Sequence, residues 1–267
     1  MPYIISIANN KGGCGKTTVT TSLADALGKR NLRVLVIDMD PQSNTTKRLC
    51  PRSTTLRRTL YDFFEIFEKN DTSQPVNIQD LIYPTELNNV DFVPNVGITA
   101  ILEPAISDKR EKSLYYLRER FRDYSLTNYD ITLIDNPPNM GTFVLLSLYA
   151  SDFVLVPVKA GSADSVEGLI KATDKIKEIR DGGKSPDLKF LRIIINSMDK
   201  RTNICNALVT QIKKHFADDQ LIKTVIPVNT AFEQAESRGA TIFQEDGASS
   251  GARAFRKIAQ ELIDILQ

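Results

Sequence analysis

Short hydrophobic runs rich in β-branched residues alternate along the chain with longer segments in which apolar residues recur every three or four positions. The short runs show little alternation of polar and apolar residues, which is typical of strands buried on both faces of a parallel sheet. The pattern predicts seven strands: Tyr3 to Ala8, Val34 to Asp38, Val90 to Val93, Ile131 to Asp135, Phe153 to Val158, Phe190 to Asn196 and Thr224 to Ile226.

Amphipathic helices are predicted between these strands. In the segment Thr17 to Lys29 the apolar residues Val19, Leu23 and Leu27 share one helical face. The same spacing predicts helices over Ser113 to Tyr124, Ser165 to Ile179, Ile204 to Phe216 and Ala252 to Leu266. Strands that alternate with helices indicate a doubly wound α/β fold, with helices flanking a mostly parallel sheet of about seven or eight strands.

The chain has the length and composition of an ordinary globular domain. It has 267 residues, of which 42% are hydrophobic and 25% charged, so it can bury a full core. Residues 45–89 are the least regular part, with a helix expected at Leu56 to Phe67 and a polar linker at Lys69 to Pro75. We interpret residues 1–267 as a single domain with a partly helical insertion at about 45–89.

Charge, cysteine content and the lack of long apolar runs indicate where the protein acts and what it can bind. The net charge of +1 gives no overall attraction to nucleic acid, so any such binding requires a local basic patch. The three cysteines are far apart and odd in number, which fits a reducing compartment. No apolar run reaches about 18 residues, and the first ten residues lack the features of an export signal. We therefore expect a cytoplasmic protein that does not bind membranes.

A glycine-rich loop directly follows the first predicted strand and precedes the first predicted helix. The loop comprises Lys11, Gly12, Gly13, Cys14, Gly15, Lys16, Thr17 and Thr18. Glycines let backbone N–H groups turn toward phosphate oxygens, and the helix N-terminus adds a favourable dipole. We expect Lys16 to bridge the β- and γ-phosphates of ATP, Thr17 to bind Mg²⁺ and Thr18 to contact the α-phosphate.

The loop departs from the ordinary phosphate-loop pattern in an informative way. Asn10 stands where that pattern has its first glycine, and a second lysine, Lys11, follows it. The loop thus resembles the deviant Walker A motif of the ParA/MinD superfamily of dimerising ATPases. The resemblance implies that Lys11 reaches across a homodimer interface to the partner's nucleotide and supplies the charge of an arginine finger.

Acidic residues follow two of the predicted strands. Asp38 and Asp40 end the second strand, and Asp135 ends the strand Ile131 to Asp135. Acids at strand ends also serve in turns and helix caps, but beside a phosphate loop carboxylates are needed to hold Mg²⁺ through water and to orient the attacking water. The resemblance assigns Asp38 and Asp135 to the metal, with water between carboxylate and ion, and Asp40 to the hydrolytic water.

Later segments match the ParA branch in order, so the resemblance covers essentially the whole chain. It implies that Asn196 contacts adenine and that Pro227 and Val228 form the wall beside the base. Asn196 also has a simpler interpretation as a turn-forming residue.

The ParA resemblance implies a DNA partition or segregation ATPase. Such a protein forms a homodimer with ATP, binds nonspecific double-stranded DNA on the nucleoid, and is released when an adaptor of the ParB type stimulates hydrolysis. From Lys189 to Lys257 there are 11 Lys and Arg residues against 7 Asp and Glu residues, an excess of 4 that could form a DNA-binding strip. The candidate contacts are Lys200, Arg201, Arg238, Arg253, Arg256 and Lys257.

Three related functions remain as alternatives. A positioning ATPase for a protein cargo or an organelle would share every feature above. A MinD-like ATPase of the division site would require a basic amphipathic anchor, whereas the segment Ile258 to Leu266 carries acids and resembles a packing helix. An electron carrier of the nitrogenase-reductase kind would require a late pair of thiolates, and only Cys205 lies late in the chain.

Overall fold

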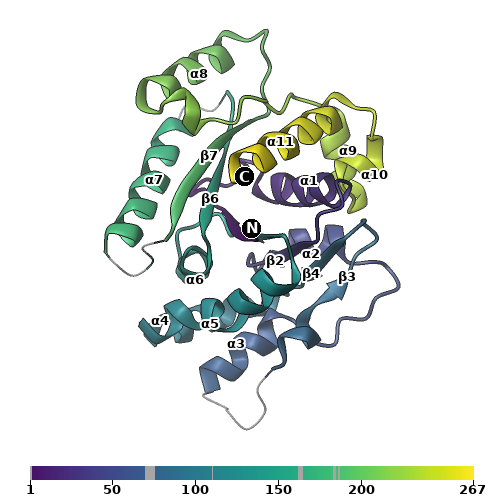
Figure 1. The fold of residues 1–267 in the computed structure, drawn as a ribbon, viewed down its shortest axis with the longest axis vertical. Coiled ribbons are helices and arrows are strands. Elements are labelled where there is room, and N and C mark those ends of the chain that lie inside the picture. The colour runs from purple at the N-terminus through teal and green to yellow at the C-terminus, as the bar shows by residue number, and fades with distance from the viewer. Residues whose placement is uncertain (1, 70–75, 110, 162–164, 183–184, 186) are drawn as a thin grey trace.

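The computed structural model describes residues 2–69, 76–109, 111–161, 165–182, 185 and 187–267. Its centre is a seven-stranded sheet with the strand order β3-β4-β2-β5-β1-β6-β7 (Figure 1). Neighbouring strands run parallel except for β3 and β4, which pair antiparallel. The strands are β1 (Tyr3–Ile7), β2 (Val34–Asp38), β3 (Tyr83–Pro84), β4 (Val90–Val93), β5 (Ile131–Asp135), β6 (Phe153–Lys159) and β7 (Lys189–Asn196).

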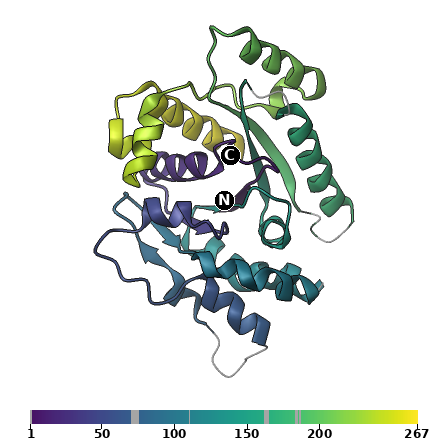
Figure 2. The same cartoon turned by 180° about the vertical axis from the view of Figure 1, so that it is seen from behind.

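Helices cover both faces of this sheet (Figures 1 and 2). They are α1 (Lys16–Gly28), α2 (Asn44–Leu49), α3 (Leu60–Lys69), α4 (Glu103–Asp108), α5 (Glu111–Asn128), α6 (Thr142–Ala150), α7 (Ser165–Asp181), α8 (Asn203–His215), α9 (Thr230–Arg238), α10 (Ile242–Asp246) and α11 (Ser250–Leu266). Three 3₁₀ turns, Ile78–Leu81, Gly97–Leu102 and Asp218–Gln220, complete the described elements. The predicted doubly wound α/β fold with a mostly parallel sheet is therefore confirmed.

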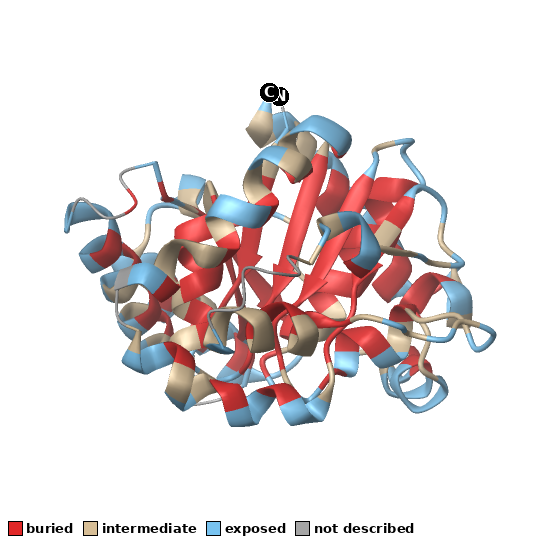
Figure 3. Cartoon of the chain, turned by 90° about the horizontal axis from the view of Figure 1, so that it is seen from below, coloured by how far each residue is buried: buried red, intermediate tan, exposed pale blue. Residues whose placement is uncertain are grey.

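Alternate side chains of each central strand enter different parts of the core. Ile5 and Ile7 of β1 pack into a cluster with residues of α1 and α11, whereas Ile4 packs with residues of α3, α5 and α6 on the other face. A third cluster joins β6 and β7 to α6, α7 and α8. Figure 3 shows the strands as a buried layer with exposed residues on the outer surfaces of the helices. Burial on both faces explains why the strands read as continuous hydrophobic runs.

The predicted strand Thr224 to Ile226 is wrong. Ile226 donates its backbone N–H to Ile195 of β7, but the chain around this segment forms only two isolated bridges, Ile193 of β7 with Leu221 and Met198, beyond β7, with Pro227. The side chain of Glu261 explains why the ladder is broken, since it accepts hydrogen bonds from the backbone N–H groups of Lys223 and Thr224. The seventh strand is instead the short edge strand β3, whose two residues include a proline and carry little hydrophobic signal.

Part of the helical structure has no periodic signature in the sequence. Helix α6 is buried on almost every side, so its apolar residues do not repeat at helical spacing, and no helix is predicted there. The helices α2, α4 and α10 have five or six residues each, too few for a periodic pattern.

The irregular segment 45–89 contains α2, α3, a 3₁₀ turn and β3. The helix predicted from Leu56 begins at Leu60, because the Thr59 hydroxyl accepts the backbone N–H of Tyr61 and the carboxylate of Asp62 accepts that of Thr59. Most of the predicted linker, residues 70–75, lies outside the described residues. In the part of the chain that the structure describes, no helix has the length and apolarity required to cross a membrane.

Candidate functional site

The glycine-rich loop connects the end of β1 to the start of α1. Two side chains outside the loop hold its backbone. The amide of Asn9 donates to the carbonyl of Pro157 in β6 at 2.7 Å, and its oxygen accepts the backbone N–H of Lys11 at 3.1 Å. The amide of Asn196, at the end of β7, donates to the carbonyl of Cys14 at 3.0 Å. The loop is thus fixed to the two strands on one side of β1.

Gly15 is required at its position for two reasons. Its φ of +92° lies in the left-handed region, which other residues rarely adopt. A Cβ atom at Gly15 would also lie 2.1 Å from the amide nitrogen of Asn196, so the side chain that holds the loop leaves no room for a methyl group. This close approach explains why glycine immediately precedes the first residue of α1.

Lys16 and Lys11 lie together in the loop. The Lys16 ammonium is buried and donates to the carbonyl oxygens of Asn9 and Lys11 at 3.2 and 3.1 Å. Lys11 is half-buried. The Cys14 thiol is buried beneath the loop, and this burial raises the pKa of the thiol although Lys16 opposes the effect. A raised pKa disfavours the reactive thiolate form of Cys14.

The three predicted acids meet at the carboxyl ends of β2 and β5. Asp38 and Asp135 are register partners in adjacent strands, and both are fully buried. Asp135 accepts the hydroxyl of Thr17 at 2.8 Å and that of Thr45 at 2.7 Å. Asp38 is held by Thr46 in α2 and accepts the backbone N–H of Asp40. The structure therefore links the first turn of α1 directly to the end of β5, and α2 to the ends of both strands.

Burial of these acids changes their protonation. Burial, together with the charge of Asp135, raises the pKa of Asp38 to about 8. Burial and the charge of Asp40 also raise the pKa of Asp135. Protonated forms are favoured because two carboxylates in a low-dielectric site repel each other and lose hydration. Among the described residues, no three His, Cys, Asp or Glu side chains are arranged to hold a metal ion unaided.

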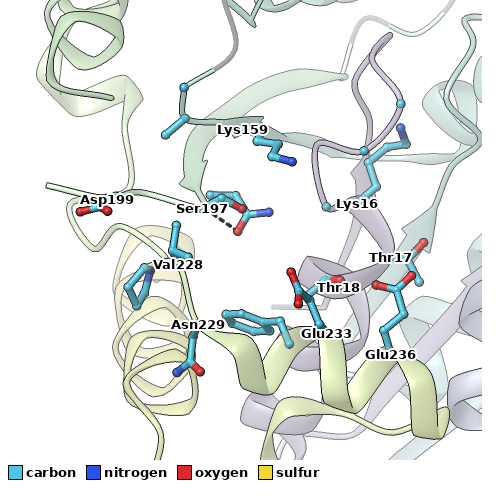
Figure 4. Close-up of a pocket in the computed structure, with 18 of the residues that line it drawn as sticks. Lys16, Thr17, Thr18, Lys159, Ser197, Asp199, Val228, Asn229, Glu233 and Glu236 are labelled. Atoms are coloured by element: carbon cyan, nitrogen blue, oxygen red, sulfur yellow. Dashed lines mark hydrogen bonds between the residues drawn. The ribbon is translucent and has the colours of Figure 1, made fainter. Parts of the chain in front are cut away.

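A pocket of about 850 Å³ opens in front of the loop (Figure 4). This volume lies within the range of roughly 300–1,000 Å³ that is typical of ligand sites. Most of the predicted nucleotide-site residues line it: Gly12, Gly13, Gly15, Lys16, Thr17, Thr18, Asp40, Asn196, Pro227 and Val228. Lys11, Cys14, Asp38 and Asp135 are not among the lining residues.

The far wall of the pocket comes from the ends of β7 and of the segment before α9. Asn196 accepts the backbone N–H of Ser197 in addition to holding the loop, so its amide group is engaged within the protein. Val228 is 61% exposed, and Phe232 of α9 lines the same pocket. The adenine contact of Asn196 and the wall role of Pro227 and Val228 stay predictions.

Several charged lining residues are missing from the sequence prediction. Lys159 is the last residue of β6, and Figure 4 shows its side chain extending toward the loop. Its position at the carboxyl end of a strand could have indicated a residue of the site, because ligands of α/β sheets bind there. Arg48, Glu233 and Glu236 reach the pocket from α2 and α9, and no sequence signal indicates that those two helices face it.

The six predicted DNA contacts fall into separate places. Lys200 and Arg201 lie in the turn between β7 and α8, where Arg201 forms an ion pair with Asp199 at 2.9 Å. Arg238 ends α9 and pairs with Glu245 of α10, also at 2.9 Å. The other three, Arg253, Arg256 and Lys257, are exposed on α11 and spaced to share one face of that helix.

Two cations that directly follow α1 extend the α11 group. Arg256 and Lys29 both lie over the ring of Phe243, at 5.1 and 5.2 Å from its centroid. Arg30 donates to the carbonyl oxygen of Arg256 at 3.1 Å. We call the exposed residues Lys29, Arg30, Arg253, Arg256 and Lys257 the α11 cationic surface. Only the packing of α1 against α11 brings these distant segments together.

The fold and site together define a class of protein. A glycine-rich loop between β1 and α1 has two glycines with positive φ, acids stand at the ends of two strands beside it, and a pocket opens at the carboxyl edge of a doubly wound sheet. These are the features of a P-loop nucleotide-binding protein.

Comparison with known sequences defines the family. The model of a family described as an AAA domain matches residues 3–190. The chain is 33% identical to the chromosome partitioning protein ParA of Myxococcus xanthus over 97% of this chain and 87% of that protein. It is also 33% identical to the chromosome-partitioning ATPase Soj of Thermus thermophilus, over 98% of this chain and 96% of Soj. The chain therefore belongs to the ParA/Soj family of P-loop ATPases, as the loop motif predicts.

Solved structures agree with the fold. Cobyrinic acid a,c-diamide synthase from Mycobacterium smegmatis, with a bound ATP analogue and magnesium, superposes with a TM-score of 0.79 at 23% identity, covering 98% of this chain and 95% of that one. The apo McdA of Cyanothece gives a TM-score of 0.83 at 20% identity, covering all of both chains. The cell division ATPase MinD of Pyrococcus furiosus gives 0.78 at 24% identity, covering 99% of this chain and all of MinD.

Proposed function

We propose that this chain is an ATP-dependent DNA partition ATPase. It binds ATP with Mg²⁺ in the pocket, forms a homodimer around the nucleotide, and binds duplex DNA without sequence preference until an adaptor protein stimulates hydrolysis. The observation that supports the proposal best is the deviant loop itself, in which the Lys16 ammonium is bonded to the backbone carbonyl of Lys11 and the neighbouring Thr17 is bonded to Asp135 of β5. The ParA and Soj relatives support the partition role.

The donor set fits a magnesium ion. The hydroxyl of Thr17 lies at the pocket and is bonded to the buried Asp135, so a cation on that hydroxyl would stand close to two carboxylates that repel each other. When bound, Mg²⁺ neutralises charge on the β- and γ-phosphates. We assign Thr17 to direct ligation and Asp38 and Asp135 to contacts through water.

The remaining residues have separate roles at the nucleotide. Backbone N–H groups of the loop and the ammonium of Lys16 hold the phosphates, and Lys16 exchanges its bonds to loop carbonyls for phosphate oxygens. Asp40 lines the pocket and orients the attacking water. Lys11 supplies positive charge to the partner's nucleotide, which makes hydrolysis depend on dimerisation.

The α11 cationic surface is our proposed DNA face. Its cations come from α11 and from the two residues that follow α1, a helix packed against α11, and Arg256 and Lys29 are held over one ring. Arg201 and Arg238 are each paired with an acid, which lowers their expected contribution, and the same holds for Lys29, which is paired with the buried Asp25. Binding through such side chains to phosphates carries no sequence information.

The substitution Lys16→Ala tests the nucleotide site. Loss of the buried ammonium removes the main cation on the phosphates, so ATP affinity should fall at least a hundredfold in isothermal titration calorimetry. Thermal unfolding without nucleotide serves as the control for folding. An ATP affinity equal to that of the native chain contradicts the assignment of the loop.

The substitution Lys11→Ala separates nucleotide binding from dimerisation. This variant should bind ATP but remain a monomer in sedimentation with ATP and Mg²⁺, because the lysine that reaches the partner's nucleotide is missing. The native chain under the same conditions is the control. If the variant sediments as a normal ATP-dependent dimer, Lys11 does not act across an interface.

The substitution Asp40→Ala should slow hydrolysis without loss of ATP binding, because it removes the group that orients water. We expect turnover to fall by about two orders of magnitude or more, so that ATP persists in the complex for hours with Mg²⁺. Chromatography of the bound nucleotide measures this. Turnover at the native rate would assign the water to another residue.

The double substitution Arg30→Gln with Arg256→Gln tests the DNA face. With ATP and Mg²⁺, affinity for an arbitrary duplex should fall, and the slope of log K against log salt should become shallower by about 0.9 for each phosphate that the variant no longer neutralises. Arg180→Gln, which removes an exposed arginine of α7 paired with Asp181, is the matched control. If the double variant keeps the native affinity and slope, as the control should, DNA does not bind at this surface.

A further inference from the structure

Arg48 is a buried cation that connects three elements around the nucleotide pocket. It lies on α2, and its guanidinium donates to the hydroxyl of Thr18 in α1 at 3.1 Å. The same guanidinium forms an ion pair with Glu236 of α9 at 3.2 Å. Only 7% of the Arg48 side chain is exposed, and the residue lines the pocket. None of the site roles assigned above uses Arg48.

The two partners of Arg48 differ in how firmly they are held. Thr18 belongs to the first turn of α1, next to residues fixed by the loop contacts. The side chain of Glu236 is 68% exposed, so water competes for its carboxylate, and such a pair contributes little to stability. Burial lowers the pKa of Arg48, because the low-dielectric site disfavours its charge. An anion in the pocket would therefore be a strong competitor for this guanidinium.

We propose that Arg48 is a further nucleotide-binding residue that contacts the α-phosphate, and that Glu236 holds it in place until nucleotide arrives. The inference rests on the proposed nucleotide site, in which the α-phosphate lies against Thr18. A guanidinium bonded to the Thr18 hydroxyl is within reach of that phosphate, and its planar fork suits phosphate oxygens. Nucleotide binding then exchanges the ion pair with Glu236 for a pair with phosphate.

Glu233 offers a matched control for Glu236. It lies three residues earlier on α9 and lines the same pocket (Figure 4). Removing either acid lowers the negative charge near the phosphates by the same amount. The two substitutions differ in that Glu236 is the ion-pair partner of Arg48. A comparison of the two therefore separates general electrostatics from release of the guanidinium.

The experiment measures ADP affinity by calorimetry in a double-mutant cycle of Arg48→Gln and Glu236→Gln. Arg48→Gln should weaken ADP binding about ten- to a hundredfold, as expected for hydrogen bonds to a charged group, and Arg48→Lys should recover part of the loss. Glu236→Gln should tighten binding about two- to fivefold in the native background, and in the Arg48→Gln background it should change binding only by the factor that Glu233→Gln produces. Glu233→Gln should change binding by the same factor in both backgrounds.

Each alternative result has a defined meaning. If Arg48→Gln and Glu236→Gln weaken binding equally, the ion pair is only structural and the inference is overturned. Native affinity in Arg48→Gln, with the native chain binding ADP, overturns the inference but leaves the proposed function intact. A native chain that does not bind ADP overturns both. Melting temperatures identify any variant that fails to fold. If Arg48→Gln does not fold, the ADP affinity of Arg48→Lys, which keeps the charge, decides whether Arg48 contacts the nucleotide.

Discussion

The register of β1, β5 and β2 is the constraint on which the rest of the structure depends. Because these strands are parallel, their carboxyl ends meet at one edge of the sheet, and Asp38 and Asp135 become direct neighbours there. The chain thereby buries two acids that repel each other, in an environment that raises the pKa of both. Folding alone gains little from such an arrangement, since a low-dielectric site disfavours the charged forms of both acids. Under the proposed function, a cation and the phosphates it carries would offset this cost.

The loop in front of these acids depends on contacts with distant parts of the chain. Asn9 and Asn196 tie it to β6 and β7, and the close approach of Asn196 leaves room only for glycine at position 15. On the other side of the loop, the hydroxyls of Thr17 in α1 and Thr45 in α2 both donate to Asp135. The backbone N–H groups are thus positioned by tertiary contacts before any phosphate arrives, which reduces the entropy lost on binding. Cations complete the site on both walls, through Lys159 at the end of β6 and Arg48 on α2.

Most of the fold was predictable because its main signals are local. Six of the seven predicted strands appear with nearly the predicted bounds, since β-branched runs buried on both faces have one dominant pattern. The failures have a common cause in tertiary contacts. Glu261 accepts the backbone N–H groups of Lys223 and Thr224 at the start of the segment Thr224 to Ile226, and α6 is too thoroughly buried to show a periodic face. A proline-containing strand as short as β3 has no local signature at all.

The chemistry at the core of the site can be inferred from local sequence alone. A strand, a glycine-rich loop and a helix follow one another, with Lys11 and Lys16 in the loop and acids after two later strands. This order indicates a phosphate-binding site from local spacing alone. Tertiary structure alone decided which distant residues join that core. Arg48 and Glu236 meet across α2 and α9, and Arg30 joins Arg256 because α1 packs against α11. The physical reason is that helix packing brings together side chains that are far apart in sequence, and no periodicity within either segment records which partner lies opposite.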